Sequence, residues 1–180
     1  MYVQKLDGTS ADIIDLKDHD PSWAVEFQRE RVRIASCLED AAVSIDHIGS
    51  TAVPGLRAKP VIDIMVSVHE LVLGSVEGPL SSLGYVHVPI PENDRLFFRK
   101  GMPRTHHLHV VVEGSEGYWK HIRFRDRLIA HPEDAEEYAR LKEDLAMRYR
   151  TDRVAYSDGK DELIAEILAR DASEGRRETV

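Results

Sequence analysis

The sequence has one cysteine, Cys37, in 180 residues. A single thiol forms neither an intramolecular disulfide nor a thiolate-rich zinc site, so both kinds of stabilisation are excluded. The sequence also lacks any run of the roughly 18 to 20 apolar residues that a membrane-spanning helix needs, and its first residues lack the basic-then-apolar order of a signal peptide. We therefore expect a cytoplasmic protein with no membrane partner.

Basic residues are the minority among the charged residues. The 24 lysines and arginines are outnumbered by 32 aspartates and glutamates, which gives a formal net charge of −8. Duplex-binding proteins gain affinity by neutralising phosphates, so this balance argues against duplex nucleic acid as a partner. Acidic residues are nevertheless absent from two intervals that contain lysines and arginines, residues 47–62 and 95–112. These intervals predict a local anion site, with chance clustering on a solvated face as the alternative.

Aromatic residues are few, at 7%, but 42% of the residues are hydrophobic, which is enough for a core. Alternating apolar residues predict strands at 43–48, 61–68, 85–88, 96–100 and 107–112. Helical spacing predicts a helix from Asp20-Pro21 to about residues 38–40, a short helix within 71–83, and three helical segments after Glu116, with a turn or cap at 157–159. We predict one α+β domain over residues 1–171, followed by a polar tail over 172–180.

The loop at residues 49–60 carries the most informative pattern. Gly49 has no Cβ and follows a strand, so a phosphate can approach its backbone, and Ser50 adds a hydroxyl donor. Asp63 lies thirteen residues after Ser50, on the polar face of the next predicted strand, where it can hold Mg²⁺ against that phosphate. In the alternative interpretation, Ser50 and Thr51 hydrogen-bond their own loop and Asp63 caps it.

Two histidines lie on one side of the last predicted strand. His107 and His109 are two residues apart, which separates them by roughly 7 Å on one face. Together with Asp63 they can bind a transition metal, and Glu113 shares their strand parity. The alternative is that both are hydrogen-bonded interior histidines.

Residues 47–66 resemble the GrpB-like family, which belongs to the nucleotidyltransferase superfold. Further stretches that carry the resemblance are residues 18–23, 104–110, 124–128, 130–132 and 155–160, so that it spans roughly residues 12 to 170. The resemblance implies a nucleotidyltransferase-like mixed β-sheet packed against helices, with a helical C-terminal part. Members similar to this chain also occur fused to dephospho-CoA kinase.

This sequence departs from the superfold at one position. Active members pair Gly-Ser with Asp-x-Asp, but Met65 occupies the second acidic position here, and a thioether is a poor ligand for a hard cation. Glu113, Asp46 and Asp94 are the candidate replacements for the missing carboxylate.

The resemblance and the residues together predict a protein that binds a nucleotide or another phosphate-bearing ligand with Mg²⁺ or another divalent cation. Asp63 is the candidate catalytic residue for transfer of a nucleotidyl group to a small acceptor. The alternative function is a non-catalytic module for a nucleotide or a coenzyme-A-like ligand. The predicted phosphate-binding residues are Gly49, Ser50, Thr51, Arg57, Lys59 and Arg104, and the predicted metal ligands are Asp63, His107, His109 and Glu113.

Overall fold

The computed structural model describes residues 13–174. The helices are α1 (Ser22–Leu38), α2 (Leu73–Ser82), α3 (Glu116–Ala130), α4 (Pro132–Arg148), α5 (Arg153–Asp158) and α6 (Asp161–Glu174), with short 3-10 helices at Glu39–Ala41 and Ser50–Ala52. The strands are β1 (Ser44–Ile48), β2 (Ile62–Val68), β3 (Tyr85–His87), β4 (Arg95–Lys100) and β5 (His106–Val112). None of the helices within residues 13–174 has the length and apolar character that crossing a membrane requires.

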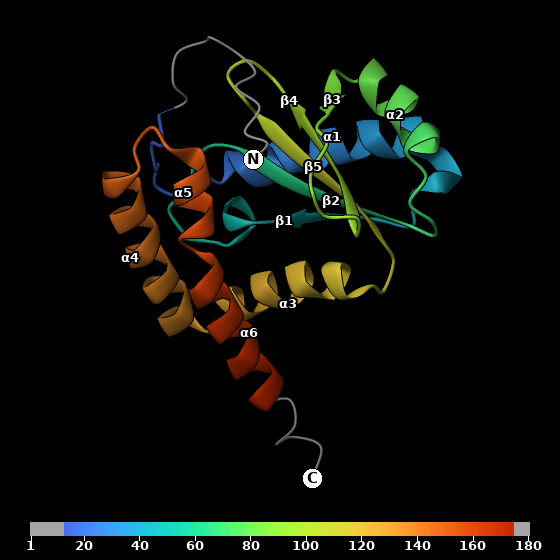
Figure 1. Ribbon diagram of the computed structural model, residues 1–180. Coiled ribbons are helices and arrows are strands. Elements are labelled where there is room, and N and C mark those ends of the chain that lie inside the picture. The colour runs from blue at the N-terminus through green and yellow to red at the C-terminus, as the bar shows by residue number, and fades with distance from the viewer. Residues whose placement is uncertain (1–12, 175–180) are drawn as a thin grey trace.

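The five strands form one mixed sheet in the order β1-β2-β5-β4-β3 (Figure 1). β2 and β5 are parallel neighbours at its centre, and the other pairings are antiparallel. In this register Asp63 of β2 lies beside Ile48 of β1 and His107 of β5. The predicted α+β class with a mixed sheet is confirmed.

One face of the sheet carries the larger apolar core. Alternate residues of β2, from Ile62 to Val68, are buried against Trp23 and Phe27 of α1 and Leu80 of α2. α1 begins where the sequence predicts, because the Asp20 carboxylate accepts a hydrogen bond from the Ser22 N–H at 2.8 Å. The period-2 pattern of β2 therefore fixes which side chains point into this core and which point to the opposite face.

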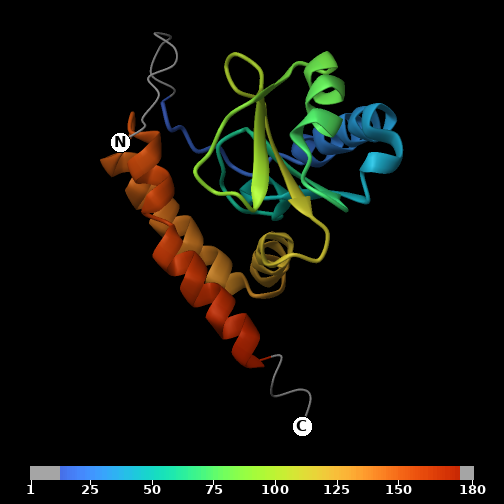
Figure 2. The same cartoon turned by 45° about the vertical axis from the view of Figure 1, so that its right-hand side comes forward.

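The opposite face is covered in two parts. Tyr118 and Ile122 of α3 pack on Met65 and its neighbours. α4 and α6 run side by side beyond one end of the sheet, with α5 between them in sequence (Figure 2). The helical C-terminal part is thus confirmed, and the space that it leaves over the sheet contains the candidate site.

Two predicted boundaries need correction. Ser157 and Asp158, predicted with Gly159 as a turn or cap, are the end of α5, and Gly159 is the C-cap of that helix. The polar tail does not begin at residue 172, because α6 continues to Glu174 and the Ser173 hydroxyl donates to the Arg170 carbonyl at 2.7 Å. The rest of that tail lies outside the described residues.

Candidate anion-binding site

A cavity of about 390 Å³ lies between the polar face of the sheet and the C-terminal helices. It is enclosed by the loop before β2, by strands β2, β4 and β5, and by α4, α5 and α6. Its polar and charged lining residues are Ser50, Thr51, Lys59, Asp63, Arg95, His107, His109, Lys142, Tyr156, Ser157, Lys160 and Asp161.

The loop and Asp63 converge at Gly49. Gly49 has φ +70°, and a Cβ at this position would lie 2.5 Å from Oδ2 of Asp63. This contact follows from the pairing of β1 with β2, because Ile48 is the register partner of Asp63. The loop backbone therefore touches the carboxylate directly, and only glycine fits between them.

Gly49→Ala is expected to lower the free energy of unfolding by about 3 kcal/mol, through both a strained φ and a clash with Asp63. Gly55→Ala is the matched control, since Gly55 in the same loop has φ +78°, but a Cβ added there would meet no other described residue within 4 Å. That control is expected to lose about 1 kcal/mol, the cost of the backbone strain alone. Urea denaturation measures both losses, and equal losses would contradict the Asp63 contact.

Asp63 forms a pair with His107. Nδ1 of His107 lies 3.0 Å from Oδ1 of Asp63, and both side chains are partly buried. Burial acts to raise the pKa of the Asp63 carboxyl, but the hydrogen bond with His107 and the electrostatic interactions with His107, His109 and Lys59 outweigh it, so the pKa lies below its ordinary value. Asp63 is therefore a carboxylate at neutral pH. Because its contact with His107 is through Nδ1, the Nε2 atom of His107 is available for other contacts.

His109 and Glu113 do not join Asp63 and His107 in one metal-binding group. Nδ1 of His109 lies 3.2 Å from Nη1 of Arg95. Glu113 follows the far end of β5, where its carboxylate is 4.0 Å from His69. Six residues separate it from His107, roughly 20 Å along a strand. Strand parity predicts the face correctly but not the position along it, so the prediction of Glu113 as a ligand beside Asp63 is wrong.

Met65 confirms the departure from an Asp-x-Asp pair. Its side chain is fully buried in an apolar cluster with Ile48 and Val111. Asp46, a candidate replacement, accepts a hydrogen bond from Ser44 at 2.7 Å and lies 4.0 Å from Arg125. The carboxylates that line the cavity among residues 13–174 are those of Asp63 and Asp161. A two-metal centre needs several anionic ligands around both ions, and this set does not fit one.

Two lysines of the cavity come from the C-terminal helical part. Lys142 is 2% exposed, its ammonium donates to the Arg57 carbonyl, and burial lowers its pKa to about 7.

The ammonium groups of Lys59 and Lys160 lie 4.8 and 4.7 Å from the ring centroid of Tyr156. Burial lowers the pKa of Lys59 to about 8 and also lowers that of Lys160. One buried and two half-buried lysines thus face one cavity.

Lys142 and Lys160 were not predicted as site residues from the sequence. Lys142 lies four residues after Tyr138 and three before Leu145, on the buried stripe of α4. A lysine inside an apolar stripe is the signal that identifies it, because a lysine is seldom buried without a partner. Lys160 lies in a stretch that carries the family resemblance, but local periodicity gives it no special position.

Arg57 and Arg104 lie outside this cavity. The Arg57 guanidinium is 2.6 Å from Glu143 of α4 and 2.9 Å from Asp18, so it ties the loop to two other segments. Arg104 lines a smaller neighbouring cavity that also contains Lys59. Their roles as phosphate ligands remain predictions.

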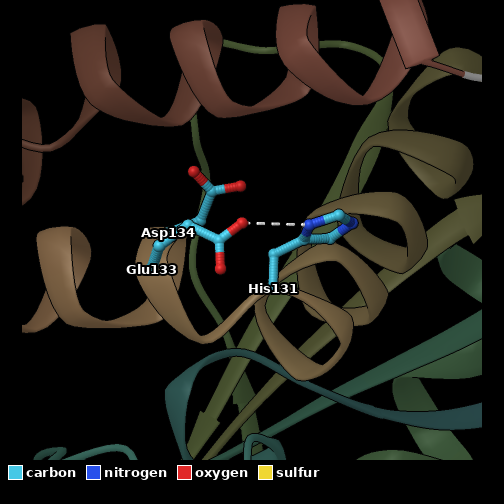
Figure 3. Close-up of side chains that lie close together, drawn as sticks. All are labelled: His131, Glu133 and Asp134. Carbon is cyan, nitrogen blue, oxygen red and sulfur yellow. Dashed lines mark hydrogen bonds and ion pairs between the residues drawn. The ribbon is translucent and has the colours of Figure 1, made fainter.

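A second group of potential ligands lies at the start of α4 (Figure 3). One donor atom each of His131, Glu133 and Asp134 lies within 4.8 Å of the others, the one such group among the described residues. Asp134 is buried, and its two oxygens accept hydrogen bonds from Arg127 and Arg170, each at 2.6 Å. Two guanidinium groups already neutralise this carboxylate, so the cluster is an ion-paired helix junction.

Comparison with known proteins gives consistent matches. A family model described as GrpB protein matches residues 13–170. A UPF0157 protein of Pseudomonas aeruginosa is 42% identical over 179 residues, covering 93% of this chain and 71% of that protein. The glutamate-rich protein GrpB of Alkalihalophilus pseudofirmus is 33% identical, covering 89% of this chain and 97% of that protein.

A solved structure and a more distant relative extend these matches. The crystal structure of conserved protein GrpB from Enterococcus faecalis has a TM-score of 0.81 and 30% identity, covering 89% of this chain and 98% of that one. A dephospho-CoA kinase of Mycolicibacterium paratuberculosis is 27% identical over 165 residues, which cover 76% of this chain but 40% of the kinase. The chain therefore belongs to the GrpB protein family.

Proposed function

We propose that the cavity binds a small phosphate-bearing molecule, a nucleotide or a coenzyme-A-like compound. The observation that carries this proposal is the convergence of Lys59, Lys142 and Lys160 on one concave site in a chain of net charge −8. Buried like charges are unfavourable unless an anion compensates them. A phosphate group can supply that compensation by accepting charge-assisted hydrogen bonds from lysine ammonium groups in the cavity.

The size and the remaining lining support a ligand of this kind. A cavity of about 390 Å³ is within the usual range for small-molecule sites. Ser50 and Thr51 add hydroxyl groups next to the point where Gly49 contacts Asp63. The similarity to part of a dephospho-CoA kinase, an enzyme named for a phosphate-bearing nucleotide substrate, agrees with the proposed ligand class.

The lysines supply positive charge that metal ions provide in two-metal nucleotidyltransferases. Binding is therefore expected to persist when divalent cations are chelated. A divalent cation at Asp63 is a separate prediction, because one carboxylate with a histidine beside it is a possible single-ion site. The affinity for ATP is measured once in EDTA and once in Mg²⁺. Equal affinities indicate binding by the lysines alone, and a higher affinity in Mg²⁺ indicates that a divalent cation also contributes.

One observation favours transfer of a nucleotidyl group as a second candidate function. The Asp63 carboxylate orients the imidazole of His107 at the cavity wall, an arrangement that suits His107 to take a proton from an attacking hydroxyl. This function requires turnover of a nucleoside triphosphate by the wild type and its loss in Asp63→Ala. If the protein binds a nucleoside triphosphate but does not turn it over with any of a panel of small acceptors, nucleotidyl transfer is rejected and the binding function still stands.

The binding proposal is tested by titrating ATP, coenzyme A and adenosine into the protein in EDTA, with calorimetry as the readout. ATP and coenzyme A are expected to bind, and Lys160→Met is expected to weaken ATP by about tenfold or more. Lys120→Met is the matched control, since Lys120 is exposed on α3 and outside the cavity lining. Adenosine binding as tightly as ATP, or an equal loss in both variants, would reject the lysines as phosphate ligands.

A further inference from the structure

Three aromatic side chains lie together on the sheet side of the main cavity. Phe97 of β4 is the register partner of His109 of β5, and their ring centroids are 5.0 Å apart. The Phe97 ring centroid also lies 5.4 Å from that of His107. All three residues line the cavity. The sheet therefore contributes a contiguous aromatic surface to the site, whereas the C-terminal helical part contributes lysines.

This aromatic surface lies further along the strands than the predicted phosphate-binding loop. His107 is the register partner of Asp63, and His109 follows two residues later, roughly 7 Å along β5. Lys59 precedes β2, so it lies on the other side of Asp63 along the chain. A ligand with its phosphate group among the lysines can therefore extend past Asp63 to Phe97 and His109.

His109 is held as a neutral ring with a fixed hydrogen-bond donor. A guanidinium only donates, so the contact of Arg95 with Nδ1 of His109 at 3.2 Å leaves the proton of the neutral ring on Nε2. Burial is the main cause that holds the pKa of His109 well below its ordinary value, although the Asp63 carboxylate acts in the opposite direction. The Arg95 guanidinium itself lies 3.7 Å from Glu92. This end of the cavity therefore suits a flat, uncharged group.

We propose that Phe97 and His109 bind the planar base of a nucleotide whose phosphate group lies among the lysines. This inference rests on the proposed function and adds the part of the ligand that the aromatic surface recognises. The base stacks on the Phe97 ring, and Nε2 of His109 donates to an acceptor atom on the edge of the base. Because every nucleobase has a flat π-face, this contact selects nucleotides over phosphorylated sugars.

The test compares AMP with ribose 5-phosphate by calorimetry in EDTA, since both carry one phosphate group on a ribose and only AMP carries a base. Wild type is expected to bind AMP about tenfold or more tightly. Phe97→Leu keeps an apolar side chain but removes the ring, so it is expected to lose about fivefold or more in AMP affinity and less than about twofold in ribose 5-phosphate affinity.

Trp119→Leu is the matched control, since Trp119 is a 45% exposed aromatic residue of α3 outside the cavity lining, and it is expected to leave both affinities unchanged. Equal affinity of wild type for AMP and ribose 5-phosphate overturns the inference, and this comparison stays decisive if Phe97→Leu fails to fold. An unchanged AMP affinity in folded Phe97→Leu, or an equal loss in Trp119→Leu, overturns it as well. Binding of ribose 5-phosphate in any of these cases leaves the proposed function standing, whereas no binding of either compound or of ATP overturns both.

Discussion

Lys59→Glu is expected to lower nucleotide affinity by about a hundredfold or more, since it replaces a phosphate ligand with a carboxylate that repels phosphate. Lys59 lines both cavities, so an anion bound in either one lies close to it. Lys59→Met, which removes the positive charge without adding a negative one, is expected to lose about tenfold. Calorimetric titration of ATP into the three proteins measures this series.

The same substitution is expected not to destabilise the fold. Burial, the largest cause of the lowered Lys59 pKa, disfavours a charged glutamate as it disfavours a charged lysine. The charges of Arg153, Lys160 and Arg104 attract a glutamate at this half-buried position, whereas Asp63 repels it, so the melting temperature of Lys59→Glu should stay close to that of wild type while binding is lost. A protein that melts earlier and still binds ATP with wild-type affinity would show that Lys59 is structural.

Asp134→Ala is expected to lower the free energy of unfolding by about 3–5 kcal/mol, because it removes one partner of a buried ion pair, the carboxylate that binds the buried Arg127 guanidinium. Arg127 and Asp134 are 4% and 2% exposed at their side chains and 2.6 Å apart, and Arg170 binds the second oxygen of Asp134. In a chain of this size the loss corresponds to a fall in melting temperature of roughly 10 °C. Thermal denaturation followed by circular dichroism measures it.

Glu133→Ala is the control for this junction. Glu133 is the neighbouring carboxylate on the first turn of α4, its side chain is 70% exposed, and its contact is with His131. Its loss is expected to change stability by less than about 0.5 kcal/mol. If both alanine variants melted at the same temperature, the buried pair would not be the contact that holds α3, α4 and α6 together.

The sheet side of the site was predictable from local sequence pattern. Apolar residues alternate through β2, which places Asp63 opposite the face that packs on α1. A short loop between two predicted strands also makes them neighbours, so Gly49 and Asp63 are close for reasons of chain connectivity. The same period-2 rule put His107 on the face of Asp63, where the two side chains are hydrogen-bonded.

The helical side was not predictable in the same way. Periodicity shows that α4 has a buried stripe, but it does not show which surface that stripe meets. Lys142 and Lys160 reach the cavity only because α4 and α6 pack beside the sheet, some eighty to a hundred residues after Asp63 in sequence. The prediction of Glu113 as a metal ligand beside Asp63 was wrong for a related reason, because strand parity shows which face a residue lies on but not its position along the strand. Arg57 forms ion pairs with Glu143 and Asp18 outside the cavity, and no local sequence pattern connects it to either residue.

A phosphate group that binds among the lysines of the main cavity should shield them from chemical modification. Acetylation of the folded protein with and without saturating ATP in EDTA tests this, with the extent of acetylation at each lysine measured by mass spectrometry. We expect ATP to protect Lys59 and Lys160 several-fold while exposed Lys120 reacts at an unchanged rate. ATP that binds measurably but leaves Lys59 and Lys160 as reactive as before would contradict the claim.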